Sequence, residues 1–515
     1  MTAASPQSSS NGTAPPEHVD VLIVGAGLSG IGAAAHLQDA FPQRSYLLLE
    51  AREASGGTWD LFRYPGIRSD SDMHTLGYRF RPWTDQKAIA DGPAILDYIR
   101  ETARDYGIDR RIRYRHKVVR ADWSSEDARW TVEATRGDTG ETVHFTCHFL
   151  FICGGYYRYD QGYLPEFEGV ERFKGEFFHA QHWPDDLEFA GRRVVVIGSG
   201  ATAMTIVPAM AGEAEHVTML QRSPTYVVTL PAIDPIAEFL RRKLPVRTAY
   251  WLIRWKNVLL QALSYRLSRR RPQLMKKLLR HGLERQLPPG YDIDTHFKPR
   301  YNPWDQRLCL VPDGDLFKAI GQGHASIETD EVETFTEHGI KLRSGKELPA
   351  DIVVAATGLN LLALGGVQMA VDGEEVEIPQ RMAYKAMMLS DVPNMAFTVG
   401  YTNASWTLKA DLTAEYVCRL LRHMDEHGYD VATPEQRDPT VTEQPFLDFN
   451  AGYVLRSLHL FPKQGSKAPW QLRQNYPRDI KTLRHDPIDD GTMVFTSRRT
   501  RGASGEDERV AVAAG

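Results

Sequence analysis

The chain has 515 residues, of which 42% are hydrophobic and 25% are charged, and its formal net charge is -5 at pH 7. This composition excludes a collagen-like, fibrous or wholly disordered chain, and the length predicts two or three domains. The negative net charge argues against nucleic acid as the main partner. The four cysteines (Cys147, Cys153, Cys309 and Cys418) have neither metal-ligand spacing nor the density of a disulfide framework. We therefore expect no bound metal and a reducing, cytoplasmic setting.

The two ends of the chain predict tails. Residues 1–17 are rich in Ser, Pro and Asn and lack the basic and apolar regions of a signal peptide, so they predict a disordered tail. Residues 491–515 are similarly loose in composition and predict a flexible tail. No run of about 18 apolar residues occurs, so no segment is expected to span a membrane.

The first ordered segment reads VDVLIVGAGLSGIGAAAHLQDA, an apolar strand, a glycine turn and an Ala-rich helix. Gly25, Gly27 and Gly30 form a G-x-G-x-x-G pattern, in which the glycines allow a tight turn, the approach of a pyrophosphate and close helix–strand packing. Glu50 lies 20 residues after Gly30 at the end of the next strand, where a carboxylate can accept ribose hydroxyls. The unit predicts a dinucleotide site; an ordinary strand–helix turn is the alternative.

A second such unit opens in RRVVVIGSGATAMTIVPAMAG. Gly198, Gly200 and Ala203 form G-x-G-x-x-A, a permitted variant of the same pattern. Two such units in one chain predict FAD in the first site and a nicotinamide nucleotide in the second.

The position after the second unit's next strand indicates which nucleotide binds. Gln221 replaces the acid found at Glu50 and is followed by Arg222 and Ser223. A guanidinium beside a hydroxyl suits a 2′-phosphate, which favours NADPH over NADH. The alternative is that Arg222 is only a solvated charge at a strand end.

Residues 241–290 contain 14 Lys or Arg residues and a single acid, Glu284, in helix-compatible sequence. They predict a helical insertion over about 230–300. A solvated face of this insertion, bordering the substrate cavity and the nucleotide phosphates, is favoured over association with an anionic membrane surface.

These elements predict an α/β fold with two Rossmann-like dinucleotide-binding domains, one for FAD and one for NADP, the latter carrying the helical insertion. Residues 18–165 and 341–490 are assigned to a discontinuous FAD domain, and residues 166–340 to the NADP domain. Weak linkers fall near 161–169 and 340–350.

The chain contains three spaced motifs. The stretch FKGEFFHAQHWP fits F-x-G-x-x-x-H-x-x-x-W-P through Phe173, Gly175, His179, Trp183 and Pro184. GGTWDLFRYPGIRSD is a second signature, and Asp351 followed by ATG is a third. With these motifs the chain resembles the type I Baeyer–Villiger monooxygenases from about residue 18 to about 490. YNPWDQRLCLVPDGDLFKAI and GYTNASWTLKADL are similar to the actinobacterial branch that includes the mycobacterial ethionamide-activating monooxygenase.

The resemblance implies an FAD enzyme that uses NADPH and O2 to convert ketones to esters or lactones through a flavin C4a-peroxide. Oxidation of thioethers or thioamides is an implied side activity. Because the cofactor supplies the nucleophile, no Ser/His/Asp or Cys/His set is required. In the family the fingerprint lies between the two domains, so His179 is implied to couple nucleotide binding to domain motion. A linker histidine without functional weight is the alternative. The preferred ketone and the oligomeric state stay open.

The family pattern places the catalytic guanidinium at Arg307, in WDQRLCL, with Asp70 as its partner. A permanent cation suits the stabilisation of negative oxygen, whereas a purely structural ion pair is the alternative. Many relatives carry Lys just before this Arg, but Gln306 stands here, so the NADPH preference would depend more on Arg222 and Ser223.

The cofactor contacts implied by the resemblance are carried over position by position. The FAD contacts are Ser29, Glu50, Thr58, Trp59, Asp60, Leu61, Asp70 and Val118. The NADP contacts are Arg68, Ser69, Asp70, Gly198, Ser199, Gly200, Ala201, Thr202, Ala203, Met204, Arg222 and Ser223.

Other functions with the same architecture remain to be weighed. A disulfide reductase is disfavoured, because Cys147 and Cys153 lie on or beside an apolar strand and are expected to be buried. A flavin-containing monooxygenase that oxidises only N or S is the second enzyme hypothesis. A flavin-binding redox sensor is the non-enzyme hypothesis, against which Arg307, Asp70 and Trp183 argue.

Overall fold

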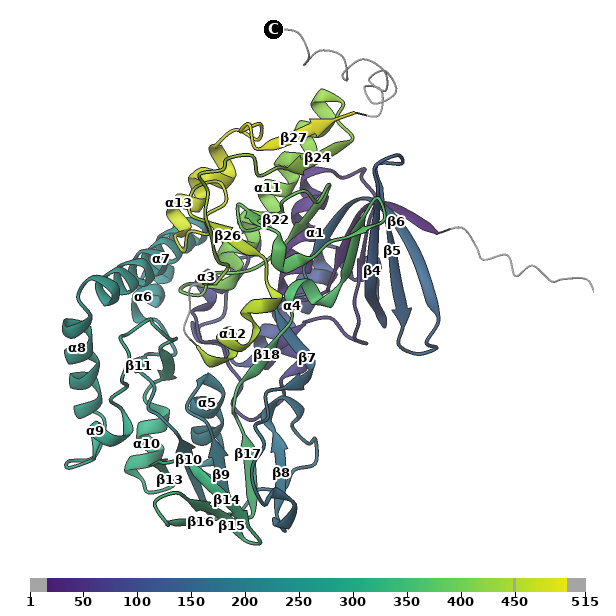
Figure 1. Ribbon diagram of the computed structural model, residues 1–515. Helices are drawn as coiled ribbons and strands as arrows, with labels where there is room; N and C mark the ends of the chain where they lie inside the picture. The colour runs from purple at the N-terminus through teal and green to yellow at the C-terminus, as the bar shows by residue number, and fades with distance from the viewer. Residues whose placement is uncertain (1–15, 448–450, 498–515) are drawn as a thin grey trace, which may run out of the picture.

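The computed structural model describes residues 16–447 and 451–497 (Figure 1). Most of the two predicted tails, residues 1–15 and 498–515, lies outside the described residues. Strand β1 begins at Glu17, and β27 (Met493–Thr496) pairs with β24 (Val431–Pro434). The predicted tails are therefore too long at their inner ends, because these residues pair with other strands. In the described ranges, no helix combines the length and apolar character needed to cross a bilayer.

Nine strands of the described residues form the first sheet, at the right of Figure 1. β1 pairs in parallel with β2 and β6, and β4, β5 and β6 form an antiparallel meander. The order is β20-β19-β4-β5-β6-β1-β2-β3, with β23 beside β6. The strands are β1 (Glu17–Val24), β2 (Tyr46–Leu49), β3 (Ile112–Arg113), β4 (His116–Ser124), β5 (Arg129–Arg136), β6 (Thr142–Ile152), β19 (Gln368–Val371), β20 (Glu374–Glu375) and β23 (Met395–Phe397).

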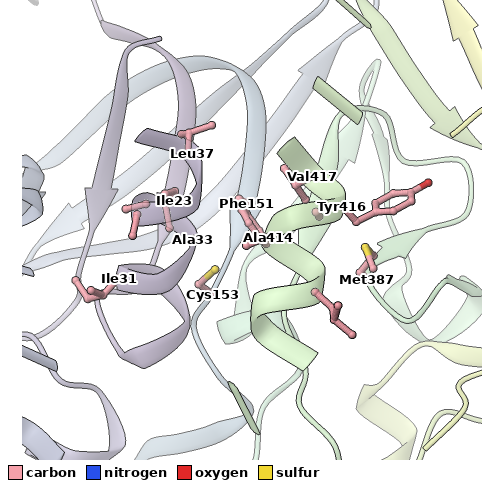
Figure 2. Close-up of a cluster of buried hydrophobic side chains, with 14 of the residues drawn as sticks. Ile23, Ile31, Ala33, Leu37, Phe151, Cys153, Met387, Ala414, Tyr416 and Val417 are labelled. Atoms are coloured by element: carbon pink, nitrogen blue, oxygen red, sulfur yellow. The ribbon is translucent and has the colours of Figure 1, made fainter. Parts of the chain in front are cut away.

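Apolar side chains on both faces of β1 bury its second half, residues 21–24. Val21 and Ile23 face the helices α1 (Leu28–Ala40) and α11 (Trp406–His427), whereas Leu22 belongs to a separate cluster on the other face. Figure 2 shows the first cluster, in which side chains of β1, α1 and α11 meet. A near-continuous apolar strand is expected where a parallel sheet is covered on both sides. We call each sheet, together with the helices packed on it, a unit. The first unit is thus built from two separate stretches of the chain.

Five strands of the described residues form the second sheet, at the bottom of Figure 1, and all of its pairs are parallel. The order β13-β10-β9-β17-β8 joins β8 (Glu176–His179), β9 (Arg193–Ile197), β10 (His216–Gln221), β13 (Ala325–Thr329) and β17 (Ile352–Ala355). The predicted return to the first unit at residue 341 is wrong for β17, which pairs with β9 and β8. An apolar strand alone does not indicate which of two sheets it joins.

Four helices occupy the segment predicted to be a helical insertion. They are α6 (Pro235–Lys243), α7 (Val246–Arg270), α8 (Pro272–Glu284) and α9 (Ile293–His296). In Figure 1 they lie along the left flank of the molecule, away from the first sheet.

The chain crosses between the two sheets along a pair of strands. β7 (Tyr157–Gly162) leads toward the second sheet and pairs antiparallel with β18 (Leu359–Leu361), which leads back. The remaining helices are α2 (Thr58–Leu61), α3 (Met73–Leu76), α4 (Gly92–Asp105), α5 (Ala201–Met210), α10 (Asp315–Gly321), α12 (Gly452–Ser457) and α13 (Tyr476–Ile480). The remaining strands are β11 (Val227–Leu230), β12 (Cys309–Pro312), β14 (Val332–Thr336), β15 (Gly339–Leu342), β16 (Glu347–Pro349), β21 (Ala383–Tyr384), β22 (Met388–Leu389), β25 (Glu443–Pro445) and β26 (Lys463–Gly465).

Candidate active site

The first glycine turn joins β1 to α1 and leaves no room for side chains. Gly25 has a φ of +100°, and a Cβ on Gly30 would lie 1.9 Å from the Gly25 carbonyl oxygen. A Cβ on Gly27 would lie 3.4 Å from the Cα of Gly57, the residue that precedes α2. Gly27 is the N-cap residue of α1, and no side chain of the described residues accepts the first N–H groups of this helix. These N–H groups are therefore available to a ligand. We call this turn the first cradle; it fits a pyrophosphate.

Glu50 lies beside the first cradle at the end of β2 and is buried. Its Oε2 accepts the N–H of Ala26 at 2.8 Å, and its Oε1 accepts the N–H of Arg52 at 3.0 Å. Burial raises the pKa of Glu50, although these two N–H groups act in the opposite direction. Each carboxylate oxygen has a further lone pair, so Glu50 can still accept a ribose hydroxyl. The N–H of His116 donates to the Glu50 carbonyl at 2.9 Å, which sets the start of β4, and with it Val118, beside this residue.

The four predicted contacts Thr58, Trp59, Asp60 and Leu61 form the short helix α2. The buried carboxylate of Asp60 pairs with Arg52 at 2.6 Å and with Arg100 at 2.7 Å. Asp60 is therefore held by structural ion pairs, which leaves its backbone as the group that can meet a cofactor. The hydroxyl of Thr58 lies 3.2 Å from that of Tyr159.

Ser29 is covered by a residue that the sequence analysis did not select. The indole N–H of Trp406, the first residue of α11, donates to the Ser29 hydroxyl at 2.8 Å. Its ring stacks on Tyr156 with a centroid distance of 5.1 Å. Trp406 ends the GYTNASW stretch, so its signal was present, but only the tertiary fold brings it to the first cradle.

The second glycine turn, between β9 and α5, is open on one side. A Cβ on Gly198 would lie 2.3 Å from the Ala356 carbonyl oxygen, whereas a Cβ on Gly200 would meet nothing within 4 Å. Gly200 caps α5 without help from any described side chain, so the N–H groups of the first helical residues, Ala201, Thr202 and Ala203, are available. This second cradle also fits phosphate groups.

Two arginines lie beside the second cradle. The hydroxyl of Ser199 donates to the Ser223 carbonyl at 3.1 Å, which ties the turn to the exposed residues Arg222 and Ser223. Arg456 of α12 lies over the ring of Tyr163 at 3.4 Å, and burial together with the charge of Arg222 lowers the pKa of Arg456. Neither arginine forms an ion pair within the described residues. They create a cationic edge suited to a 2′-phosphate, and Arg456 was missed because no local pattern marks it.

The segment from Tyr64 to Asp70 crosses from the first unit onto α5. Gly66 has a φ of +71°, and a Cβ there would lie 2.6 Å from the Cβ of Ala209. Arg68 pairs with Asp315 and donates to the Met204 carbonyl at 3.3 Å. The buried hydroxyl of Ser69 donates to the Ser71 carbonyl at 2.6 Å. These contacts hold Asp70 near the second cradle.

Arg307 meets Asp70 at the junction of the two units. Its Nη2 lies 2.9 Å from Oδ2 of Asp70, and the two side chains are 33% and 37% exposed, so a ligand can reach the pair. Burial opposes the charge of Arg307, but the carboxylate of Asp70 keeps its pKa above the usual value. Burial also raises the pKa of Tyr156. The site therefore holds a permanent cation among neutral phenols.

His179 lies at the crossing between the sheets. Its Nδ1 accepts the N–H of Gln181 at 3.1 Å, so the proton resides on Nε2, which donates to the Gly358 carbonyl at 3.0 Å. Burial lowers the pKa of His179 and favours this neutral form. A Cβ on Gly162 would lie 2.1 Å from the imidazole. One side chain thus contacts β7 and the residue that precedes β18.

The other fingerprint residues pack the second unit. A Cβ on Gly175 would lie 2.3 Å from the Asp351 carbonyl oxygen, which is the close contact expected of this glycine. Phe173 packs on Phe335 at 5.8 Å, and Trp183, which precedes Pro184, meets Phe178 edge-on at 5.1 Å. Their positions give them a structural part in the second unit.

Comparison with known proteins identifies the family of this chain. A family model described as flavin-binding monooxygenase-like matches residues 85–362, and one described as an NAD(P)-binding Rossmann-like domain matches residues 23–86. The chain is 59% identical over 483 residues to the FAD-containing monooxygenase EthA of Mycobacterium tuberculosis, covering 94% of this chain and 98% of that protein. The chain belongs to the flavin-binding monooxygenase family.

Two solved structures share the fold. An oxidized steroid monooxygenase bound to NADP matches with a TM-score of 0.70 at 20% identity, covering 93% of this chain and 100% of its own. An open cyclohexanone monooxygenase matches with a TM-score of 0.67 at 18% identity, covering 81% and 90%. The chain is thus a flavin-binding monooxygenase, and its side-chain-free turns with uncapped helices suit two dinucleotides.

Proposed function

We propose that this monooxygenase uses NADPH and O2 to convert ketones to esters or lactones, and that it also oxidises sulfur in thioethers and thioamides. The Arg307–Asp70 ion pair carries the proposal. Oxygen insertion next to a carbonyl builds negative charge on the substrate oxygen, which a fixed cation stabilises. The fold shared with a cyclohexanone monooxygenase supports a ketone substrate.

FAD is assigned to the first cradle and NADPH to the second. Ser29, Glu50 and the backbone of residues 58–61 would hold FAD beside Val118, and the turn of residues 198–204 with Arg222 and Ser223 would hold NADPH. Many relatives carry a lysine where this chain has Gln306, and Arg456 would supply the positive charge that this lysine provides. When bound, NADPH supplies two electrons and FAD supplies the activation of O2.

The chain's own residues have three tasks in this reaction. Arg307 keeps a positive charge at every working pH, and Asp70 sets the direction of its guanidinium. Tyr156 and Trp406 form a stacked aromatic wall that helps to exclude water. His179, neutral and bonded across the crossing strands, positions the two units and takes no part in proton transfer.

The cysteines support the proposed cytoplasmic setting. All four lie within the described ranges, where each is buried and free. Burial raises the pKa of every one of these thiols, so they remain protonated. Free, buried thiols suit a reducing compartment and provide no redox pair for a disulfide reductase.

The test uses the purified holoenzyme with NADPH in air and a panel of ketones and thioethers, with products identified by mass spectrometry. Esters or lactones are the expected products. S-oxides or N-oxides without any ester would favour the alternative, a monooxygenase of N and S only, which the family model equally allows. Hydrogen peroxide as the sole product with every substrate would overturn both.

Replacement of the cation gives the largest catalytic prediction. Arg307→Ala should lower ester formation about 10²–10³-fold, because one preorganised donor to the developing oxyanion is lost. NADPH should still be consumed, with hydrogen peroxide as the product. Arg307→Lys should recover part of the rate, since it restores charge without the planar fork. Arg300→Ala, at an exposed arginine without an ion pair in the described residues, is the matched control.

A further inference from the structure

Exposed apolar side chains are concentrated on one flank of the molecule. Of the 16 large hydrophobic residues exposed within the described ranges, 13 lie between residues 230 and 278. Phe239 on α6, Leu263 on α7 and Leu278 on α8 are 60%, 63% and 52% exposed. Such a concentration on a monomer marks an interaction surface.

The helix α7 presents its apolar residues outward. Leu252, Trp255, Leu259 and Leu263 are all exposed and recur every three or four residues, so they form one stripe along the helix. A surface helix normally turns charged or polar residues to water. This stripe therefore needs an apolar environment beyond the chain itself.

The opposite face of α7 is anchored in the protein through polar groups. The buried guanidinium of Arg254 donates to the carbonyls of His74 at 2.7 Å and Gly77 at 3.0 Å. The amide of Asn257 donates to the Asp72 carboxylate at 2.7 Å. Because these bonds fix the rotation of the helix, the apolar stripe cannot turn inward.

Unpaired positive charge surrounds the stripe. Of the 14 Lys or Arg residues in 241–290, six reach a carboxylate in the described residues. The other eight, which include Arg247, Arg270 and Lys277, form no ion pair there. This concentration of positive charge contrasts with the net charge of -5 for the whole chain.

We propose that α6, α7 and α8, which we call the docking face, bind the anionic surface of a lipid membrane. Exposed apolar side chains would enter the interface while the unpaired cations meet lipid phosphates. A second copy of this chain would oppose like charges across the same face, whereas a bilayer supplies both negative charge and an apolar layer. Figure 1 shows the three helices on the outer flank, clear of both sheets.

The docking face also contributes to a cavity. Five residues of α7, from Val258 to Arg266, line a cavity of about 100 Å³ together with Asn403, Leu408 and Tyr476. Asn403 lies three residues before Trp406, which covers the first cradle. Docking would place this cavity at the membrane, where apolar substrates accumulate. That route rests on the proposed function, but the docking itself does not.

The first test is sedimentation of the holoenzyme with vesicles at physiological salt. It should co-sediment with phosphatidylcholine vesicles that contain phosphatidylglycerol and stay in solution with phosphatidylcholine alone. Arg270→Glu with Lys277→Glu should weaken binding about 30-fold or more, since each cation near an anionic surface contributes roughly fivefold. Arg104→Glu with Arg110→Glu, an equal charge change at exposed, unpaired positions of the described chain, should leave binding unchanged.

The second test concerns the apolar stripe. Leu259→Ser with Leu263→Ser should weaken vesicle binding about tenfold or more, because less apolar surface enters the interface. Leu164→Ser with Leu460→Ser, at exposed leucines outside the docking face, should not. Bound FAD serves as the check that each variant is folded. Wild-type protein left in solution with anionic vesicles, equal losses in the controls, or a dimer that only the stripe variant dissociates would overturn the proposal.

Discussion

The two cradles share a strand–turn–helix plan but differ in how far the rest of the chain covers them. In the first, Ser29 and Glu50 are buried, and Trp406 is bonded above them. In the second, Gly200 and Arg222 are exposed. A covered cradle suits a cofactor that remains bound, and an open one suits a nucleotide that is exchanged at every turnover. Burial, more than the glycine pattern, distinguishes the two sites.

The difference between the two cradles can be tested by substitution, and the largest effect is expected at Gly30. Gly30→Ala should lower the free energy of unfolding by at least about 1–3 kcal/mol, because its Cβ would overlap the Gly25 carbonyl oxygen. The variant should also lose most of its FAD. Flavin absorbance per protein and thermal unfolding measure both effects; a fully loaded, equally stable variant would contradict the covered first cradle.

The same substitution in the second cradle should act differently. At Gly200 the Cβ has free space and φ is −80°, so Gly200→Ala should change stability by no more than about 0.5 kcal/mol and leave FAD bound. The new Cβ would hinder the approach of the phosphate to the backbone N–H groups. The KM for NADPH should therefore rise about 10–100-fold, as expected when hydrogen bonds to charged phosphate are lost. Steady-state kinetics and FAD content provide the measurements. An unchanged KM would show that this turn does not bind the phosphates of NADPH.

The cationic edge of the second cradle predicts a smaller, selective effect. Arg222→Ala should raise the KM for NADPH about tenfold and leave that for NADH unchanged, because one charge-assisted contact to the 2′-phosphate is lost. Gln306→Lys is the converse variant and should increase the preference for NADPH. The ratio of kcat/KM for the two nucleotides is the readout. If Arg222→Ala leaves this ratio unchanged, Arg222 is a solvated charge that does not contact the 2′-phosphate.

The smallest effect should come from His179, which joins the two units. Burial depresses the pKa of His179 below 6.5, so the unfolded chain binds a proton at a higher pH than the folded chain does. The stabilising contribution of His179 is thus complete above pH 6.5 and is lost as pH falls below it. His179→Gln should flatten the fall of the unfolding temperature between pH 7.5 and 5.5; equal slopes would show that the crossing does not respond to protonation.

Sequence predicted best what local backbone geometry determines. Gly25, Gly198 and Gly175 each fill a position where a side chain would collide with neighbouring backbone, and such requirements leave a mark in the sequence itself. The strand–turn–helix starts could be predicted for that reason. The strand β17 could not be assigned to its sheet, because its apolar residues suit either one.

Contacts between distant segments were predictable only in part. Arg307 and Asp70 form an ion pair although they lie far apart in the sequence. No sequence spacing predicts this pair; it was predicted only from the resemblance to a family. Asp60 is a predicted cofactor contact, and because its carboxylate pairs with Arg100 on α4, its backbone is the group left for that contact. Trp406 and Arg456 reach the cradles from the far end of the chain; a motif contains Trp406 without showing what it contacts, and no local pattern marks Arg456.

The position of β17 has a consequence for how the second sheet assembles. Among the described strands, β8 pairs with β17 alone, and β17 lies between β8 and β9. On the ribosome, β8 must wait without a neighbour until residue 355 has emerged, while β9, β10 and β13 can already pair. The second sheet is therefore completed by a strand that arrives last and lies between two others, and a fragment cut at residue 340 lacks that strand.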